Sequence, residues 1–377
     1  ILARSISKVD FGPYALYSTL LGVGGVLIIP GLNAVINKAT LLRQLKFIGT
    51  GIKKSLRQAV FFSVLILIGV LTYNSLAELH HNTLICICAA ALTLPIMAVE
   101  RAEIILMGLN KFRKLAVFKF CNAVAKFLLV GGVAYLTQSL WKIFAALLIY
   151  LSFTAVFGFI LYRRDLRTMK SSDDYPIEKL EKEAGQISLL NICQQVMSAV
   201  SRVILYQITP ASLATYHTGS NVLTRLKDYI KLICTVPLQF WLKKGKQHFH
   251  SQVNRFSIIF MLPAILMSCL MALTAPYYIP LLFGDKYVDA VLIIQILSFS
   301  IIPKVGGYVL ESREIVLEDT RFYQKISFIQ LLLGVLFMIP LVYFYQAVGL
   351  AINNLIWSFF ELIVYAIRFR RHGKKLV

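Results

Sequence analysis

Long apolar segments, separated by short polar connections, occupy most of this sequence. Crossing about 30 Å of hydrocarbon takes roughly 20 mostly apolar residues in a helix, and these segments reach that length without the alternation of a β-strand. The pattern therefore predicts an all-α polytopic membrane protein. Its eleven predicted spans cover about residues 14–36, 59–77, 83–107, 115–136, 140–162, 186–209, 211–242, 256–282, 288–311, 322–344 and 347–367.

Composition agrees with a bilayer protein and limits the classes of function. The 377 residues are 58% hydrophobic and have a mean hydropathy of +0.72, which is more apolar mass than one soluble core buries. A formal charge of +21 could indicate nucleic-acid binding. The cations, however, lie between and within apolar segments rather than on a soluble basic domain, so no nucleic-acid partner is expected.

The sequence contains no motif typical of an enzyme active site or of a metal site. All six cysteines fall in apolar segments, where free thiols behave as small hydrophobic groups, and Cys86 and Cys88 form a C-x-C pair without a second pair of ligands. No nucleophile elbow, phosphate-binding lysine loop or zinc-binding helix motif occurs. The predicted outside loops are also too short for a catalytic domain. We expect no enzyme, no metal and no cofactor.

The distribution of Lys and Arg between alternate connections predicts the orientation. Of the 39 cations, 27 lie in one set of connections and in the tail, and four lie in the opposite set. Because cytoplasmic loops retain positive charge, the basic set and the C-terminus are predicted to be cytoplasmic. The first visible span then enters from outside. The chain begins at Ile1 rather than Met, and one further helix is expected upstream, which would give twelve spans.

A charged segment at residues 163–185 divides the predicted spans. It carries six cations and six acids with almost no apolar periodicity, so it is interpreted as a cytoplasmic linker. The predicted domains are an N-terminal lobe at 1–162 and a C-terminal lobe at 186–377. A faint repeat, residues 9–14 against residues 211–216, places a Tyr at the opening of a long helix in each lobe. Repeated halves are common in transporters that rock about a central site.

Eight cations lie inside predicted spans. A charge at mid-bilayer costs about 2.5 to 3.5 kcal/mol on insertion scales, so the presence of each one needs an explanation. Several have ordinary explanations. Arg101 has acids nearby, Lys119 is close enough to the cytoplasmic end to reach the surface, and Arg225 has an acid one helical turn away. The eight are Arg101, Lys119, Lys126, Arg202, Arg225, Lys227, Lys231 and Lys304.

Three of these cations have no acid within one turn of their own helix. Lys126, Arg202 and Lys304 are predicted to line a water-filled interior that favours an anionic group. Arg225 and Lys231 are second candidates for the same role.

Four short motifs resemble one family of transporters. The sequence SKVDFGPYAL at residues 7–16 is similar to the opening of a family's second helix, with an acid, an aromatic residue, Gly and then Tyr-Ala. The chain thereby resembles the polysaccharide transporters of the multidrug/oligosaccharidyl-lipid/polysaccharide exporter superfamily, and most of all Wzx-type O-antigen or capsule repeat-unit flippases. The other matches are LFGDKY at 282–287, AVGLA at 347–351 and the segment from Tyr216 to Pro237.

The resemblance implies a fold, a substrate and partners. The fold would be two six-helix lobes around a central cavity, and the substrate an undecaprenyl-diphosphate-linked oligosaccharide for O-antigen, lipopolysaccharide or capsule biosynthesis. The protein would lie in the bacterial cytoplasmic (inner) membrane, with a polysaccharide polymerase and a chain-length regulator as further expected partners. Arg202, Lys126 and Lys304, and secondarily Arg225 and Lys231, would hold the diphosphate or acidic sugars.

Two other functions stay open at this point. A cation-coupled multidrug exporter of the same superfamily would present buried acids, and the deep-span acids here are mainly Asp228 and Glu361. A membrane polysaccharide polymerase or ligase would be expected to carry a large outside loop with arginines, which the predicted loops are too short to provide.

Overall fold

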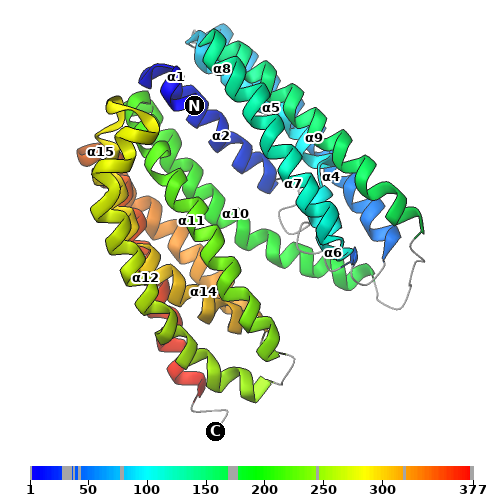
Figure 1. Cartoon of the computed structure of the whole chain (residues 1–377), viewed down its shortest axis with the longest axis vertical. Coiled ribbons are helices and arrows are strands. Elements are labelled where there is room, and N and C mark those ends of the chain that lie inside the picture. Colours follow the sequence, from blue (N-terminus) through cyan, green and yellow to red (C-terminus); the bar gives the residue numbers. More distant parts are fainter. Residues whose placement is uncertain are drawn as a thin grey trace. The chain divides into compact units, whose positions relative to one another are not determined.

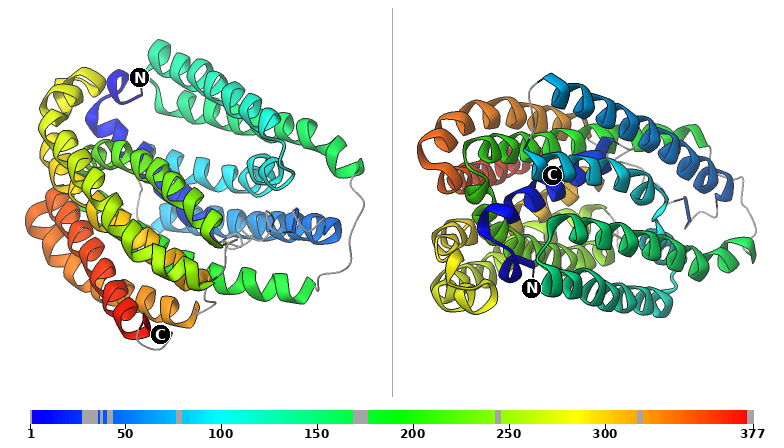
Figure 2. Two further views of the ribbon diagram at one scale, coloured as in Figure 1. Left: turned by 60° about the horizontal axis from the view of Figure 1, so that its bottom comes forward. Right: turned by 90° about the horizontal axis from the view of Figure 1, so that it is seen from above.

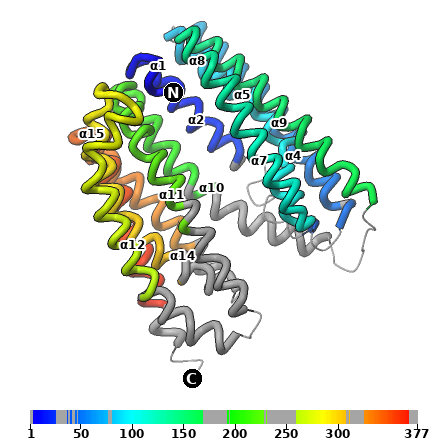
Figure 3. Tube along the Cα trace, in the orientation of Figure 1, coloured from blue at the N-terminus to red at the C-terminus, as the bar shows by residue number. Residues whose placement is uncertain are grey.

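A computed structural model describes residues 2–27, 36, 39–40, 44–76, 80–168, 177–242, 246–316 and 320–373. The parts whose side chains are also described are coloured in Figure 3. Every regular element within these ranges is a helix (Figure 1), so the prediction of an all-α chain is confirmed. Contacts divide the chain into two compact units, unit 1 at Ile1–Arg202 and unit 2 at Val203–Val377.

Unit 1 is a bundle in which α5 is the common neighbour of α2, α4 and α9. Small residues on α5 allow this close packing, which is how helices associate where lipid removes the hydrophobic driving force. Ser63 Oγ of α4 donates a 2.6 Å hydrogen bond to the carbonyl of Ala91 on α5. The elements are α1 (Leu2–Ser5), α2 (Lys8–Leu27), α4 (Leu45–Leu76), α5 (His81–Val99), α6 (Ala102–Gly108), α7 (Phe112–Lys126), η1 (Phe127–Gly131), α8 (Gly132–Thr137), α9 (Leu140–Thr168) and most of α10 (Ile177–Ile208).

Unit 2 contains three long helical segments and one interrupted helix. Helix α14 contacts both α12 and α15, and Figure 2 draws these segments in yellow-green to red. The elements after α10 are α11 (Pro210–Leu242), α12 (Lys246–Phe283), η2 (Asp285–Tyr287), α13 (Ala290–Ser298), α14 (Ile301–Val316) and α15 (Thr320–Gly373).

The last segment, α15, is two helices joined by a tight turn. Gln346 has φ 48° and ψ −124°, which no helix accommodates, and its side chain accepts a 2.7 Å hydrogen bond from Ser212 Oγ. This turn falls between the predicted spans 322–344 and 347–367. Gly349 is required beside it, because a Cβ atom there would lie 1.9 Å from the carbonyl oxygen of Leu341.

Seven segments of the described residues are long and apolar enough to cross a membrane. They account for eight of the predicted spans, since the segment Lys325–Arg368 contains both of the last two. The remaining predicted spans correspond to α2, α10 and α11, whose described residues are not among these seven segments. Residues 28–35 of the first predicted span lie outside the described residues.

The predicted linker at 163–185 is largely helical in the structure. Helix α9 continues to Thr168 and α10 begins at Ile177, while residues 169–176 lie outside the described residues. The charged composition of this segment thus belongs mainly to helix ends that extend beyond the apolar spans, and composition alone does not distinguish such ends from a loop.

Candidate functional site

The predicted cationic residues are distributed over both units. In unit 1, exposed Lys126 is the last residue of α7 and directly precedes the π-helical turn η1, and partly buried Arg202 lies on α10. In unit 2, Lys304 is partly buried on α14, whereas Arg225 on α11 is exposed. The side chain of Lys231 lies outside the described residues. Of these five residues, Lys304 has the most clearly defined surroundings.

Lys304 forms an ion pair across helices with Glu361. The Nζ atom of Lys304 on α14 contacts Oε2 of Glu361 on the second half of α15, and the two side chains are only 25% and 14% exposed. Beside this pair the helices are close, because a Cβ atom on Gly306 would lie 2.8 Å from Cδ1 of Leu362. The sequence alone left Lys304 without an acid, and the partner is 57 residues away along the chain.

A second ammonium group lies next to this pair. Nζ of Lys227 on α11 donates a 2.7 Å hydrogen bond to Oγ of Ser300, and the charges of Lys304 and Glu361 both act on it. Ser300 is fully buried, and its hydroxyl donates in turn to the carbonyl of Leu297 at the end of α13. Lys227 is thereby held through one serine at the break between α13 and α14. We call Lys227, Ser300, Lys304 and Glu361 the unit 2 cluster.

The unit 2 cluster lies at one depth along three helices. At 1.5 Å per residue, Lys304 is about 21 Å from the start of α13 at Ala290, and Glu361 is about 22 Å beyond Gln346. Lys227 is roughly 25 Å from Pro210. All three distances are below the hydrocarbon thickness of about 30 Å. Together, the two lysines and the one glutamate of the cluster give one net positive charge at this depth.

Unit 1 also has an interrupted helix with charged residues at the break. Helix α5 ends at Val99, α6 begins at Ala102, and Glu100 and Arg101 lie between them. Arg101 Nη2 donates a 3.3 Å hydrogen bond to Ser55 Oγ of α4. Interrupted helices in corresponding positions of two halves are the sequence feature that best indicates binding sites in secondary transporters. Each unit thus places a cation and an acid at or near such a break.

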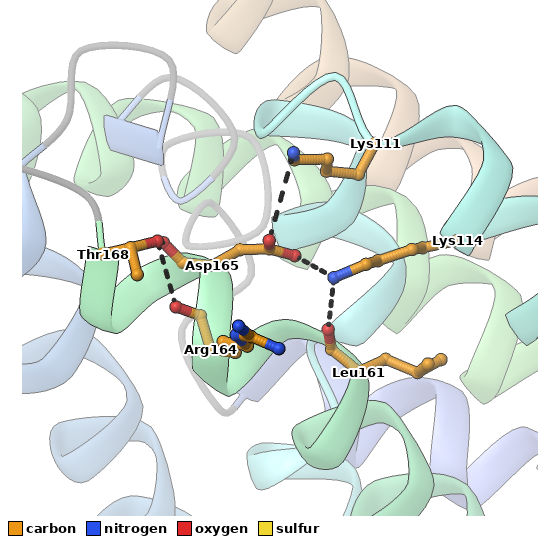
Figure 4. Close-up of polar contacts among 6 residues, drawn as sticks. All are labelled: Lys111, Lys114, Leu161, Arg164, Asp165 and Thr168. Atoms are coloured by element: carbon orange, nitrogen blue, oxygen red, sulfur yellow. Dashed lines mark hydrogen bonds and ion pairs between the residues drawn. The ribbon is translucent and has the colours of Figure 1, made fainter.

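Other charges in unit 1 have structural partners. Lys119 is exposed, and its Nζ atom lies 2.6 Å from Oε1 of Glu103, a partner that the sequence analysis did not assign to it. Figure 4 shows a second pairing, where Lys114 Nζ of α7 contacts Asp165 Oδ2 of α9 at 2.5 Å and the carbonyl of Leu161 at 3.2 Å, with Lys111 at 4.0 Å from the same carboxylate. This group joins the end of α9 to the start of α7.

Sequence reasoning missed Lys227 and Glu361 as members of one site. Lys227 was noticed only as an intramembrane cation, and Glu361 only as an exceptional acid in a late span. One signal could have connected Glu361 with Lys304, because the two residues come at similar distances, about 14 and 16 residues, from the outer ends of the predicted spans 347–367 and 288–311. Within the described residues, no group of three or more metal-binding side chains is found.

Comparisons with known proteins agree with this architecture. Residues 1–292 match the sequence family described as Polysaccharide biosynthesis protein. A search of curated protein sequences gave no match.

Solved structures of transporters share the fold at low sequence identity. An inward-facing multidrug resistance MATE family transporter of the MOP superfamily has a TM-score of 0.70 and 14% identity, covering 100% of this chain and 94% of that chain. The lipid II flippase MurJ in an inward closed conformation has a TM-score of 0.67 and 11% identity, covering 96% and 85%. A MOP superfamily transporter from Pyrococcus furiosus, described as having a binding pocket of reverse polarity that suggests a different function, has a TM-score of 0.64 and 14% identity, covering 97% and 86%.

Proposed function

Because this multi-pass membrane chain belongs to the polysaccharide biosynthesis protein family, we propose that it is a flippase for an anionic, lipid-linked sugar. The proposed substrate is an oligosaccharide repeat unit on undecaprenyl diphosphate. It moves from the cytoplasmic to the outer leaflet of a bacterial inner membrane by alternating access, and it serves O-antigen or capsule assembly. The C-terminus is cytoplasmic in this proposal, since the tail carries five of the cations that set the orientation.

The observation that carries the proposal is the net positive charge of the unit 2 cluster. Lys304 and Glu361 lie in apolar spans, where an unneeded charge is disfavoured by several kcal/mol, and Lys227 on α11 lies beside them. A diphosphate loses its hydration on entering hydrocarbon, and ammonium groups replace that hydration with charge-assisted hydrogen bonds. The polyprenyl chain can stay in lipid while the head group is held by the protein.

We propose that the predicted cations contact the diphosphate or acidic sugars during transport. Lys304 belongs to the unit 2 cluster, and Lys126 and Arg202 are the candidates in unit 1. Arg225 and Lys231 of α11 are secondary candidates. The exposed position of Lys126 at the start of a π-helical turn supports this assignment, because such turns are frequent at functional sites.

A multidrug exporter of the same fold is the main competing function. An exporter that binds organic cations needs a carboxylate free to receive them. Glu361 is instead engaged by Lys304, and Lys227 adds a further positive charge to the same cluster. The charge balance therefore favours an anionic substrate over a cationic one.

The experiment is complementation of a bacterial strain that lacks the gene. We expect the strain to accumulate lipid-linked repeat units on the cytoplasmic leaflet and to lose surface polysaccharide, whereas loss of a polymerase would leave single units on the outside. Lys126→Gln and Arg202→Gln should fail to restore polysaccharide at normal protein level. Lys119→Gln, on the same helix as Lys126 but paired with Glu103, is the matched control and should restore it. Wild-type polysaccharide in both test variants would refute the assignment of these cations.

A further inference from the structure

The unit 2 cluster contains a carboxylate that a simple anion site does not need. Lys304 and Lys227 would attract a diphosphate more strongly without Glu361, since opposite charges compete for the same ammonium groups. Glu361 also lies in a span of high hydropathy, where an ionised acid is costly. Its presence beside Lys304 therefore calls for a role.

We propose that Glu361 is an exchangeable counter-anion, which occupies Lys304 when no substrate is bound and is displaced by the substrate's phosphate. This inference rests on the proposed function and identifies a residue that sets how tightly the anion is held. One anion replaces another at Lys304, and the displaced Glu361 carboxylate takes up a proton from water, so that it is not left as an unpaired charge in the membrane. The ammonium group is thus never left unpaired in the membrane, which would be the costly state of a buried pair.

The geometry of the cluster fits such an exchange. Glu361 makes its described contact through Oε2 to Lys304, and both side chains retain some exposure, at 14% and 25%, so a phosphate oxygen can approach the ammonium group. Lys227 is fixed by fully buried Ser300 and is not bonded to Glu361. Lys227 keeps its own hydrogen bond to Ser300, while Lys304 is the cation that changes partner.

The exchange also explains how a cationic site avoids holding its substrate too firmly. Transport requires release on the far side, and a site of two uncompensated lysines would bind a diphosphate tightly and release it slowly. A carboxylate that returns to Lys304 competes with the phosphate and speeds its departure. Glu361→Gln removes this competition while it preserves the size of the side chain.

The test measures binding of inorganic diphosphate to purified, monodisperse protein in detergent. We expect Glu361→Gln to bind at least about tenfold more tightly than wild type, because a competing unit charge has been removed. Lys304→Gln should bind more weakly than wild type. Asp165→Asn, which makes the same chemical change in the ion pair at the end of α9, should bind like wild type. In cells Glu361→Gln should lower surface polysaccharide at normal protein level.

The outcomes separate this inference from the proposed function. If Lys304→Gln weakens binding but Glu361→Gln binds like wild type or more weakly, the exchange is refuted and the cationic site stands. If neither wild type nor any variant binds diphosphate, both are refuted. Should Glu361→Gln be too unstable to purify, Glu361→Asp serves instead, since its shorter side chain weakens the pair with Lys304. It is expected to bind more tightly than wild type, and equal or weaker binding would refute the exchange.

Discussion

Gly158 allows α9 to pack closely against α6 and α7, and we expect Gly158→Ala to destabilise the protein. A Cβ atom at residue 158 would lie 2.4 Å from Cβ of Ala102 and 3.1 Å from Cε2 of Phe118. Ala102 and Phe118 are themselves buried, with 1% and 2% exposure. The Cβ of Ala102 is fixed to its backbone, so the contact is relieved only if the helices move apart.

Two opposing effects set the size of the loss. Alanine is favoured over glycine within a helix by about 1 kcal/mol. Inserting a methyl group into a well-packed core costs roughly 1 to 3 kcal/mol, and a 2.4 Å approach to an immobile atom places this site at the upper end. The expected net effect is therefore a loss of about 2 kcal/mol.

The assay is the thermal unfolding midpoint of purified protein in detergent, followed by intrinsic fluorescence. Gly69→Ala in α4 is the matched control, because no atom lies within 4 Å of the added Cβ, and its midpoint should equal or exceed that of wild type. Adding Ala102→Gly to Gly158→Ala removes the facing methyl group and should recover much of the loss. A midpoint for Gly158→Ala as high as that of Gly69→Ala would refute the reasoning.

Two further substitutions test the helix connections. Gly349→Ala should prevent the turn between the last two spans from closing, because the new methyl group would lie 1.9 Å from the carbonyl oxygen of Leu341, and protein level in membranes should fall sharply. Gly307→Ala, where no atom lies within 4 Å, is the control, and equal levels of the two variants would contradict the prediction. Asp165→Asn should lower the unfolding midpoint slightly, by the equivalent of about 1 kcal/mol or less, because its pair with Lys114 is partly exposed. A loss as large as that of Gly158→Ala would show that this pair is more strongly coupled than its exposure implies.

The fold was predictable because it depends on properties that lie along the chain. Apolar length identified the helices, and Gln346 divides α15 between the predicted spans 322–344 and 347–367. The linker was less predictable, since charged helix ends such as those of α9 and α10 have the same composition as a solvated loop. Residue composition reports burial in lipid better than it reports backbone conformation.

The candidate site was predictable only in part. Lys304 was selected because no acid lies within a turn of it on its own helix, and that local criterion could not find Glu361 on another helix. Lys227 was noticed only as one of eight intramembrane cations, although in the structure it bonds to buried Ser300. The proposed roles of Lys126, Arg202, Arg225 and Lys231 stay predictions.

By itself, the sequence determined that this chain is a bundle of membrane helices, because each span must satisfy its backbone and match the hydrocarbon within its own residues. The tertiary structure decided which charges have partners. Lys304 and Glu361 are 57 residues apart, and Lys227 and Ser300 are 73 residues apart, so these contacts exist only once helices α11, α14 and α15 have packed together. The role of a cation in the membrane depends on which side chains contact it, and helix packing rather than local sequence determines those contacts.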